Sequence, residues 1–238
     1  MKRYVLAIVP ARGNSKGIPR KNIKPFLGEP LIARTLREAQ KTRLIDRLVV
    51  STESTEVARV ARRCRAEVVS RSRRLARDDT PINWVIDEVI ERLKGAAPPI
   101  SAIVVLYPTA PLRTAADIDG AIALAHRLKH YDSVAGMCEA VVAPFGGLVE
   151  RNKKLRYLDP RATRMYRRQL APRWFGLNGA IWVLNPKRLG QLNFSLLGSR
   201  TYGYLMPRER SVDLDTELDW RIAECLARSA RDGGDSDG

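Results

Sequence analysis

The chain has 238 residues, 45% of them hydrophobic, which is enough for one sizeable core and a small appendage. Its three cysteines lie far apart without a C-x-x-C pair, and no segment approaches the ~20 apolar residues of a membrane span. Neither a disulfide framework nor a zinc ribbon is therefore suggested, and we expect no membrane partner and a cytoplasmic location.

The formal net charge is +16, with 42 lysine and arginine residues against 26 aspartate and glutamate residues. Such an excess invites an anionic partner, so a basic nucleic-acid-binding protein stays open as a function of a different class. Against it, no aromatic residues interleave with the arginines as a stacking platform would require. A nucleotide substrate would account for some of the same charge.

Apolar runs alternate with helical patterns over the first half of the chain. We expect strands at residues 5–9, 47–51, 67–69 and 100–106, and helices near residues 30–42, 54–64, 80–94 and 114–130. Thr80 and Pro81 predict an N-cap followed by proline at the first helical position. The alternation predicts an α/β fold: a mostly parallel, Rossmann-like sheet with helices on both faces and ligands at the carboxyl ends of its strands.

The first strand runs directly into a loop rich in glycine and positive charge. Gly13 and Gly17 let the backbone approach an anion, and consecutive N–H groups can form a concave nest there. Arg12, Lys16 and Lys21 supply three cations around it. The glycine spacing fits neither the P-loop nor the dinucleotide G-x-G-x-x-G motif. The loop therefore predicts a third kind of polyphosphate-binding site, in preference to an ordinary basic surface turn.

Two carboxylates near the end of the chain, Asp213 and Asp215, are a candidate magnesium site. They lie two positions apart on a segment expected to be extended, so both side chains point to one face. Mg²⁺ prefers oxygen ligands, often one or two carboxylates completed by phosphates and water. Such a pair is more often two solvated surface acids, and the metal assignment depends on the family likeness described below. Asp219 is expected to belong to the following helix.

Residues 139–175 break the alternating pattern, with two adjacent glycines, three prolines, many basic residues and only short apolar runs. A loop of this length without a role is uncommon in a compact domain. We therefore expect residues 1–138 and 176–231 to form the core and residues 139–175 to form a small inserted arm. Residues 232–238 are low in hydrophobicity and predict a disordered tail.

The glycine-rich loop resembles the nucleotide-binding signature of the acylneuraminate cytidylyltransferases, the CMP-sialic acid synthetase family that includes the pseudaminic and legionaminic acid enzymes. The likeness continues, in the family's order, through Pro25 to Ile32, Val49 to Thr52, Tyr107 to Arg113, Asn178 to Ile181 and Ser211 to Asp219. Several separated blocks in one order are much harder to obtain by chance than one motif. The chain is therefore identified as a member of this family.

The resemblance implies a homodimeric enzyme that uses Mg²⁺. It would transfer CMP from CTP to the anomeric hydroxyl of a nine-carbon 2-keto sugar acid and release pyrophosphate, with the arm of one subunit helping to cover the sugar site of the other. The implied nucleotide-binding residues are Ala11, Arg12, Gly13, Ser15, Lys16, Lys21, Asn22 and Arg71. The implied sugar-binding residues are Tyr107, Thr109, Arg168, Asn178, Gly179 and Trp182. The implied catalytic residues are Arg12, Lys21, Arg168 and Asp215, and the implied metal ligands are Asp213 and Asp215.

The sugar substrate has alternatives. An eight-carbon ulosonic acid is the nearest, although residues 14–17 and 20–22 have the form seen in sialic-type enzymes. Tyr107 stands where typical sialic acid enzymes have glutamine, Gly176 where some have arginine, and residues 144–147 where some have a lysine. The loss of an amide and two cations predicts a less hydroxylated nonulosonate, such as legionaminic or pseudaminic acid, rather than N-acetylneuraminic acid.

Overall fold

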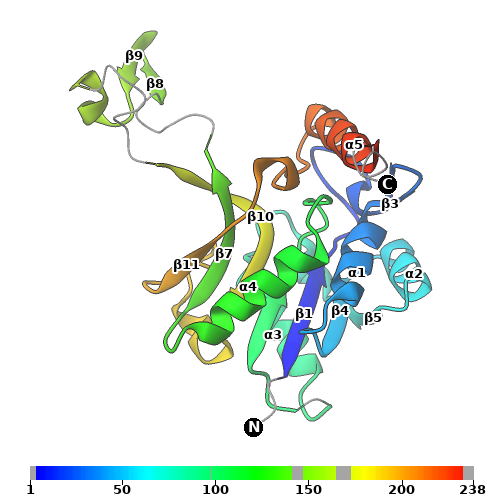
Figure 1. The fold of residues 1–238 in the computed structure, drawn as a ribbon. Coiled ribbons are helices and arrows are strands. Elements are labelled where there is room, and N and C mark those ends of the chain that lie inside the picture. The colour runs from blue at the N-terminus through cyan, green and yellow to red at the C-terminus, as the bar shows by residue number, and fades with distance from the viewer. Residues whose placement is uncertain (1–3, 97, 141–146, 165–172, 233–238) are drawn as a thin grey trace.

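The structure, a computed structural model, describes residues 4–96, 98–140, 147–164 and 173–232. It contains a seven-stranded sheet in the order β11-β7-β10-β6-β1-β4-β5 (Figure 1). These strands are β1 (Val5–Pro10), β4 (Arg47–Thr52), β5 (Glu67–Ser70), β6 (Ala102–Val105), β7 (Ser133–Glu139), β10 (Phe175–Leu184) and β11 (Thr201–Leu205). β10 runs antiparallel to both of its neighbours, and all other neighbours pair in parallel. The expectation of a mostly parallel α/β sheet is confirmed.

Helices cover both faces of this sheet, as expected. They are α1 (Leu31–Lys41), α2 (Thr55–Arg63), α3 (Ile82–Arg92) and α4 (Ala115–Arg127). A fifth helix, α5 (Glu217–Asp232), packs instead in a separate cluster with Phe26 and Leu31. Residues of α1, α2 and α4 share one buried cluster with Val5, Ala7 and Val9 of β1. Residues of α3 share a second buried cluster, on the opposite face of the sheet, with Leu6 and Ile8 of β1. The two faces alternate because successive residues of a strand point to opposite sides.

Helix starts follow from capping chemistry, with one departure from expectation. Thr114 and Asp117 form a reciprocal capping box at the start of α4, which satisfies N–H groups that have no partner within the helix. At α3, the expectation that Thr80 is the N-cap and Pro81 the first helical residue is wrong. Pro81 is itself the N-cap, with an extended ψ of 134°, and no side chain caps the helix.

The second half of the chain holds strands that local patterns did not predict, among them β7, β10 and β11, whereas α5 contains Asp219 as expected. Short additions are the pair β2 (Pro25–Phe26) and β3 (Glu29–Pro30), the hairpin β8 (Leu148–Arg151) and β9 (Lys154–Tyr157), and the 3₁₀ helices η1 (Lys21–Ile23), η2 (Arg73–Ala76), η4 (Pro160–Arg164), η6 (Pro186–Gln191) and η7 (Arg208–Arg210). The β8–β9 hairpin lies within the expected arm and stands apart from the sheet (Figure 1).

The expected domain boundaries fall close to the ends of strands and helices. Glu139 and Phe175 pair with each other as the last residue of β7 and the first of β10, so the sheet reaches both ends of the expected arm. Asp232, expected to begin the tail, is instead the last residue of α5, and the remaining tail residues lie outside the described part of the chain. Across the described ranges, no helix is both long and apolar enough to cross a membrane.

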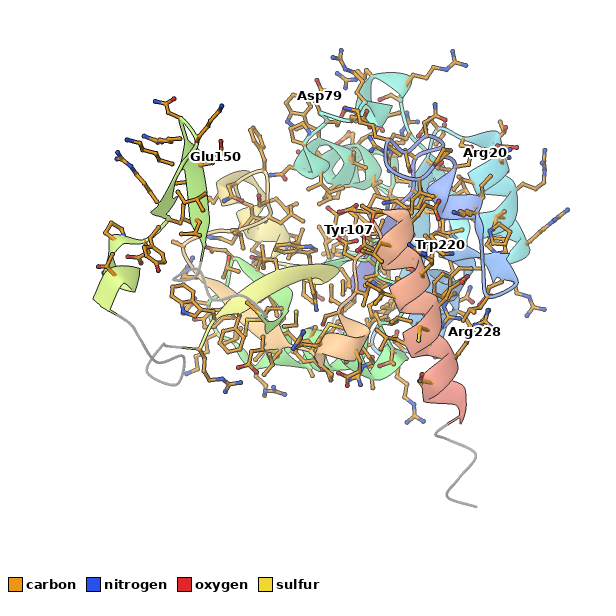
Figure 2. The ribbon with its side chains drawn as sticks, turned by 90° about the horizontal axis from the view of Figure 1, so that it is seen from above. Arg20, Asp79, Tyr107, Glu150, Trp220 and Arg228 are labelled. Atoms are coloured by element: carbon orange, nitrogen blue, oxygen red, sulfur yellow. The ribbon has the colours of Figure 1, made fainter. Side chains whose placement is uncertain are left out.

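The topology fixes where a ligand can bind. Along the chain the strand order runs outward from β1 through β4 to β5 and then returns to the other side of β1 at β6. The loops after β1 and β6 therefore leave the sheet in opposite directions and open a crevice at the carboxyl ends of the strands. Figure 2 shows the side chains from this end, with Tyr107, just after β6, near the middle of the view. Trp220 of α5 packs edge-on against Phe26, with ring centroids 5.4 Å apart.

Candidate nucleotide-binding site

A pocket of about 390 Å³ lies at this crevice. Five stretches that are separate in the sequence line it: the loop after β1, the start of the loop after β5, the region from η2 into α3, the loop after β6 and the segment before α5. Among the residues predicted from the sequence, it is lined by Arg12, Ser15, Lys16, Lys21, Asn22, Arg71, Tyr107, Thr109 and Asp215. Arg168, predicted for catalysis and sugar binding, lies outside the described residues.

The loop after β1 needs glycine because other backbone approaches it closely. A Cβ atom on Gly17 would lie 2.2 Å from the carbonyl oxygen of Asp215, a distance that no side chain tolerates. The N–H of Gly13 donates to Glu53 Oε1 over 2.7 Å, and the N–H of the buried Ala11 donates to a carbonyl of β4 over 3.0 Å. Two N–H groups of the predicted nest are therefore engaged by the protein itself, which leaves the remaining groups and the cations to meet an anion.

The three predicted cations of the loop are all paired with acids. Arg12 forms an ion pair with Asp78, and the Lys16 Nζ lies 3.1 Å from the other oxygen of the same carboxylate. Lys21, only 8% exposed, donates its ammonium to a backbone carbonyl before α5 and lies 3.3 Å from Asp215 Oδ1. A buried ammonium beside one exposed carboxylate suits contact with a phosphate that enters from the open side of the pocket.

Arg71 and Asn22 are held firmly by the backbone around them. Arg71 is 7% exposed, and its Nε and Nη2 donate to the side chain and carbonyl of Ser51 over 3.1 and 2.8 Å. Burial lowers the pKa of this guanidinium below its ordinary value. Asn22 donates its amide to the carbonyl oxygen of Arg12 over 2.8 Å, so it fixes the phosphate loop in addition to any contact with a nucleoside.

The two predicted metal ligands have different environments. Asp215 has a side chain 78% exposed and lines the pocket, whereas Asp213 accepts a hydrogen bond from Thr109 and lies against Gly179, where a Cβ would come 3.0 Å from its Oδ2. Asp213 is exposed as a residue, but the protein atoms around its carboxyl desolvate that group and raise its pKa. The charge of Asp215 raises the pKa further. A carboxylate whose charge is disfavoured by its surroundings and by a neighbouring carboxylate is a donor that fits a hard cation such as Mg²⁺.

The predicted sugar-binding residues of β10 do not line the pocket. Asn178 is 3% exposed, donates to Ser211 Oγ over 2.9 Å and accepts from the N–H of Ala180 over 3.0 Å. Gly179 adopts a positive φ of 65°, at an irregularity in the pairing of β10 with β7. Trp182 is 6% exposed and packs in the core cluster on the α3 face. A sugar contact by these three residues stays a prediction.

The backbone of Tyr107 is held by a buried arginine whose role the sequence did not reveal. Arg113 is 2% exposed and donates to the carbonyl oxygens of Tyr107 and Ala180 over 3.3 and 2.6 Å, and to Thr35 Oγ1 over 2.9 Å. It therefore ties the loop after β6 to β10 and α1. Burial raises the pKa of the Tyr107 phenol to about 12, so it stays protonated and can donate a hydrogen bond in the pocket.

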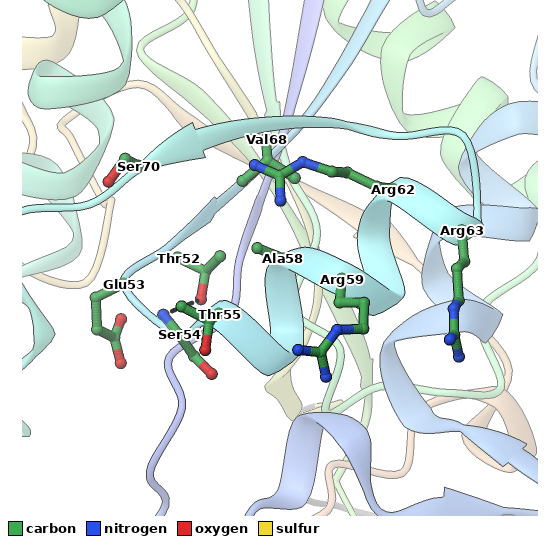
Figure 3. Close-up of a pocket in the computed structure, with 10 residues that line it drawn as sticks. All are labelled: Thr52, Glu53, Ser54, Thr55, Ala58, Arg59, Arg62, Arg63, Val68 and Ser70. Carbon is green, nitrogen blue, oxygen red and sulfur yellow. Dashed lines mark hydrogen bonds between the residues drawn. The ribbon is translucent and has the colours of Figure 1, made fainter.

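A larger hollow of about 610 Å³ lies between α2 and β5 (Figure 3). Arg62 reaches over Val68 of β5 there, and Arg59 and Arg63 extend from the same helix (Figure 3). No aromatic residue is among those that line it, so it has no stacking surface for nucleic-acid bases. None of the predicted nucleotide, sugar or metal residues lines it either, and the smaller pocket is therefore the candidate site.

Comparison with known proteins identifies the family. A family profile described as cytidylyltransferase matches residues 6–169, which include the phosphate loop, Arg71 and the loop after β6. The chain belongs to the cytidylyltransferase family. It is therefore a nucleotidyltransferase, which confirms the likeness seen in the sequence and favours an enzyme over the nucleic-acid-binding alternative.

Relatives of this cytidylyltransferase cover nearly all of its length. It is 31% identical to CMP-N,N'-diacetyllegionaminic acid synthase of Campylobacter jejuni over 93% of this chain and 94% of the relative. It is 25% identical to N-acylneuraminate cytidylyltransferase of Escherichia coli over 94% of this chain but only 52% of that protein, so it spans about half of that relative. A solved CMP:2-keto-3-deoxy-manno-octonic acid synthetase in complex with CTP has the same fold, with a TM-score of 0.72 at 14% identity over 95% of this chain and 99% of that one.

Proposed function

We propose that this enzyme transfers CMP from CTP to the anomeric hydroxyl of a nine-carbon 2-keto sugar acid and releases pyrophosphate. The observation that carries the proposal is the meeting of Arg12, Lys21 and Asp215 at one pocket beside the rigid guanidinium of Arg71. The relatives support it, because both are named for CMP-activated or N-acyl sugar acids.

The chemistry asks for positioning and charge neutralisation. The anomeric oxygen would form a bond to the α-phosphorus of CTP, the bond from that phosphorus to the bridging oxygen would break, and the hydroxyl proton would pass to solvent. Arg12, Ser15 and Lys16 would bind the leaving phosphates, and Lys21 would neutralise charge that develops at the α-phosphate. Because the Lys21 ammonium is buried and already oriented, it would act without reorganisation.

Mg²⁺ is proposed to bind at Asp215, with Asp213 as its second carboxylate. When bound, it would offset the charge of the triphosphate. The environment of Asp213 supports this role. Desolvation and the charge of Asp215 disfavour the ionised carboxylate, and a bound cation would offset this by stabilising its negative charge. Among the described residues no group of three or more histidine, cysteine or acidic side chains could hold a metal, so phosphate oxygens and water would complete the shell.

For the sugar, we propose a legionaminic or pseudaminic type of nonulosonate. Tyr107 forms part of the pocket wall where an amide would offer two hydrogen-bonding groups, and the largely buried ring presents a more apolar surface. An eight-carbon ulosonic acid is the competing substrate.

The test is pyrophosphate release from each of CTP, UTP, ATP and GTP, combined with legionaminic, pseudaminic, N-acetylneuraminic and eight-carbon ulosonic acids. We expect turnover only with CTP, Mg²⁺ and a nine-carbon acid, with the highest kcat/KM for legionaminic or pseudaminic acid. Equal turnover with all four nucleotides, or turnover without a sugar acid, would overturn the function. A preference for N-acetylneuraminic acid would overturn the substrate assignment and leave the nucleotide chemistry standing.

We also propose a homodimer built on the β8–β9 hairpin. The hairpin exposes Leu148, Leu155, Tyr157 and Leu158, at 51, 64, 46 and 62%. A two-stranded hairpin is marginal alone in water, so a second copy of the chain is the partner that would bury these side chains.

Light scattering tests this assembly. We expect twice the chain mass for the native protein and a monomer for Leu155→Asp, while Lys153→Asp in the turn of the same hairpin stays dimeric because it places the same charge outside the apolar face. A fully active native monomer would refute the proposal. The cytoplasmic location also stays a prediction. It agrees with the free thiols of Cys64, Cys138 and Cys225, because a reducing compartment keeps thiols free.

A further inference from the structure

The phosphate loop already holds anions of the protein. The carboxylate of Asp78, in the loop after η2, contacts Arg12 with one oxygen and Lys16 with the other. A second acid, Glu53, accepts the N–H of Gly13 over 2.7 Å. Two acids from neighbouring loops therefore occupy donors on which the proposed phosphate site depends.

Asp78 lies at the edge of the pocket, where its side chain can move away from Arg12 and Lys16. Its side chain is 37% exposed, on the boundary between the candidate pocket and a neighbouring hollow of about 570 Å³ that Lys16 and Arg77 also line. The hydrogen bond from Lys16 and the charge of Arg12 lower the pKa of this carboxyl, so it stays ionised near neutral pH. A carboxylate with two oxygens on two cations has the charge and geometry of part of a phosphate group.

We propose that Asp78 is an internal counter-anion that holds Arg12 and Lys16 at the pocket and is exchanged for the triphosphate when nucleotide binds. This inference rests on the proposed function, because it takes a nucleoside triphosphate as the ligand. Exchange of one anion for another keeps the two cations compensated in both states. It also reduces the affinity of the loop for phosphates, so Asp78 can take back its partners when pyrophosphate leaves.

Calorimetric titration of Asp78→Asn without sugar acid tests the exchange. We expect CTP and inorganic tripolyphosphate to bind the variant about three- to tenfold more tightly than the native enzyme, the range expected when two partly exposed cations lose their partner. Cytidine, which has no phosphate, should bind both proteins equally. The matched control is Asp79→Asn, because Asp79 is the adjacent exposed acid and pairs with Arg77, 3.2 Å away, instead of the loop cations.

Phosphate binding that is unchanged or weaker in Asp78→Asn than in Asp79→Asn would overturn the proposal. Asp78→Ser gives a second measurement should the first variant fold poorly. In steady state the exchange predicts a lower KM for CTP with an equal or lower kcat, whereas a merely structural role would raise KM. Tripolyphosphate has no base, so it separates the counter-anion role from the cytidylyl assignment. If the variant binds tripolyphosphate more tightly but the native enzyme does not prefer CTP over UTP, ATP and GTP, the cytidylyl assignment is refuted and the counter-anion role stands.

Discussion

At the scale of single residues, Asp215 connects most parts of the candidate site. Its carbonyl oxygen occupies the space that a side chain on residue 17 would need, and its carboxylate lies 3.3 Å from the ammonium of Lys21, 194 positions away in the sequence. Its N–H donates to the carboxylate of Asp219, which also accepts the N–H of Thr216 just before α5. Asp215 therefore forms a wall of the phosphate loop while its carboxylate stays open to the pocket.

Asp215→Asn should lower turnover by on the order of a hundredfold or more, because it removes charge from the proposed metal ligand while the shape of the side chain is kept. The control is Asp219→Asn, four positions later. Asparagine can still cap α5 through its side-chain oxygen, so this variant should lose less than about threefold. The measurement is pyrophosphate release at saturating Mg²⁺, with circular dichroism to check the fold. Native rates in both variants would show that the metal assignment is wrong.

At the scale of elements, hydrogen bonds to α4 and to the loop after β6 fix the segment between β11 and α5, which contains only η7 as regular structure. Arg210 makes two hydrogen bonds of 2.9 Å to Asp117 at the start of α4, and the N–H of Leu214 donates to the carbonyl of Thr109 over 2.8 Å. Although burial opposes ionisation of Asp117, the hydrogen bonds from Arg210 and Thr114 lower its pKa. The ion pair positions the segment that carries the proposed metal ligands.

Arg210→Ala should lower the free energy of unfolding by about 2–3 kcal/mol. This is less than the about 3–5 kcal/mol lost when a fully buried pair is broken, because the Arg210 side chain is 36% exposed. We also expect reduced turnover, since the segment loses its anchor to α4. Arg208→Ala, an exposed residue of the same 3₁₀ helix, is the control and should change neither quantity. Urea unfolding and initial rates are the measurements, and equal stability of the two variants would contradict the anchoring role.

At the scale of the whole molecule, a second electrostatic centre stabilises the end of the sheet away from the pocket. Asp132, 1% exposed, precedes β7 and accepts hydrogen bonds from the N–H of Arg200 and from the guanidinium groups of Arg188 and Arg200. These bonds lower the pKa of the carboxyl to about 2. One carboxylate therefore joins the starts of β7 and β11 to the loop after β10.

Stability should depend on this carboxylate in acid. Because its folded pKa of about 2 lies below the ordinary value of about 3.9, its contribution is complete above pH 4 and is lost as the pH falls toward 2. Asp132→Asn should therefore have a lower Tm than the native protein at pH 7, with a gap that closes between pH 4 and 2. Asp79→Asn, an exposed acid, should show no gap. A gap for Asp132→Asn that persists unchanged at pH 2 would exclude the ionised carboxylate as its cause.

The sequence by itself determined what local chemistry encodes. Strongly apolar runs predicted β1 and β6, periodic apolar positions predicted α1 to α4, and their alternation predicted a parallel sheet with ligands at one edge. The sequence also predicted the glycine-rich phosphate loop, and the structure supplies the reason for Gly17, which lies against a backbone oxygen that no side chain could approach. Local patterns did not predict β10, because its antiparallel direction depends on how a distant part of the chain returns to the sheet.

Only the tertiary structure decided which groups meet. Nothing in the local sequence around Asp78 relates it to Arg12, and nothing around Arg113 relates it to the carbonyls of Tyr107 and Ala180. An ion pair or a buried hydrogen bond depends on distances of a few ångströms between segments tens of residues apart, and these distances are set by strand order and packing. The sequence therefore determined which chemical groups this cytidylyltransferase has, and the fold decided which of them are placed in the pocket and which hold it in shape.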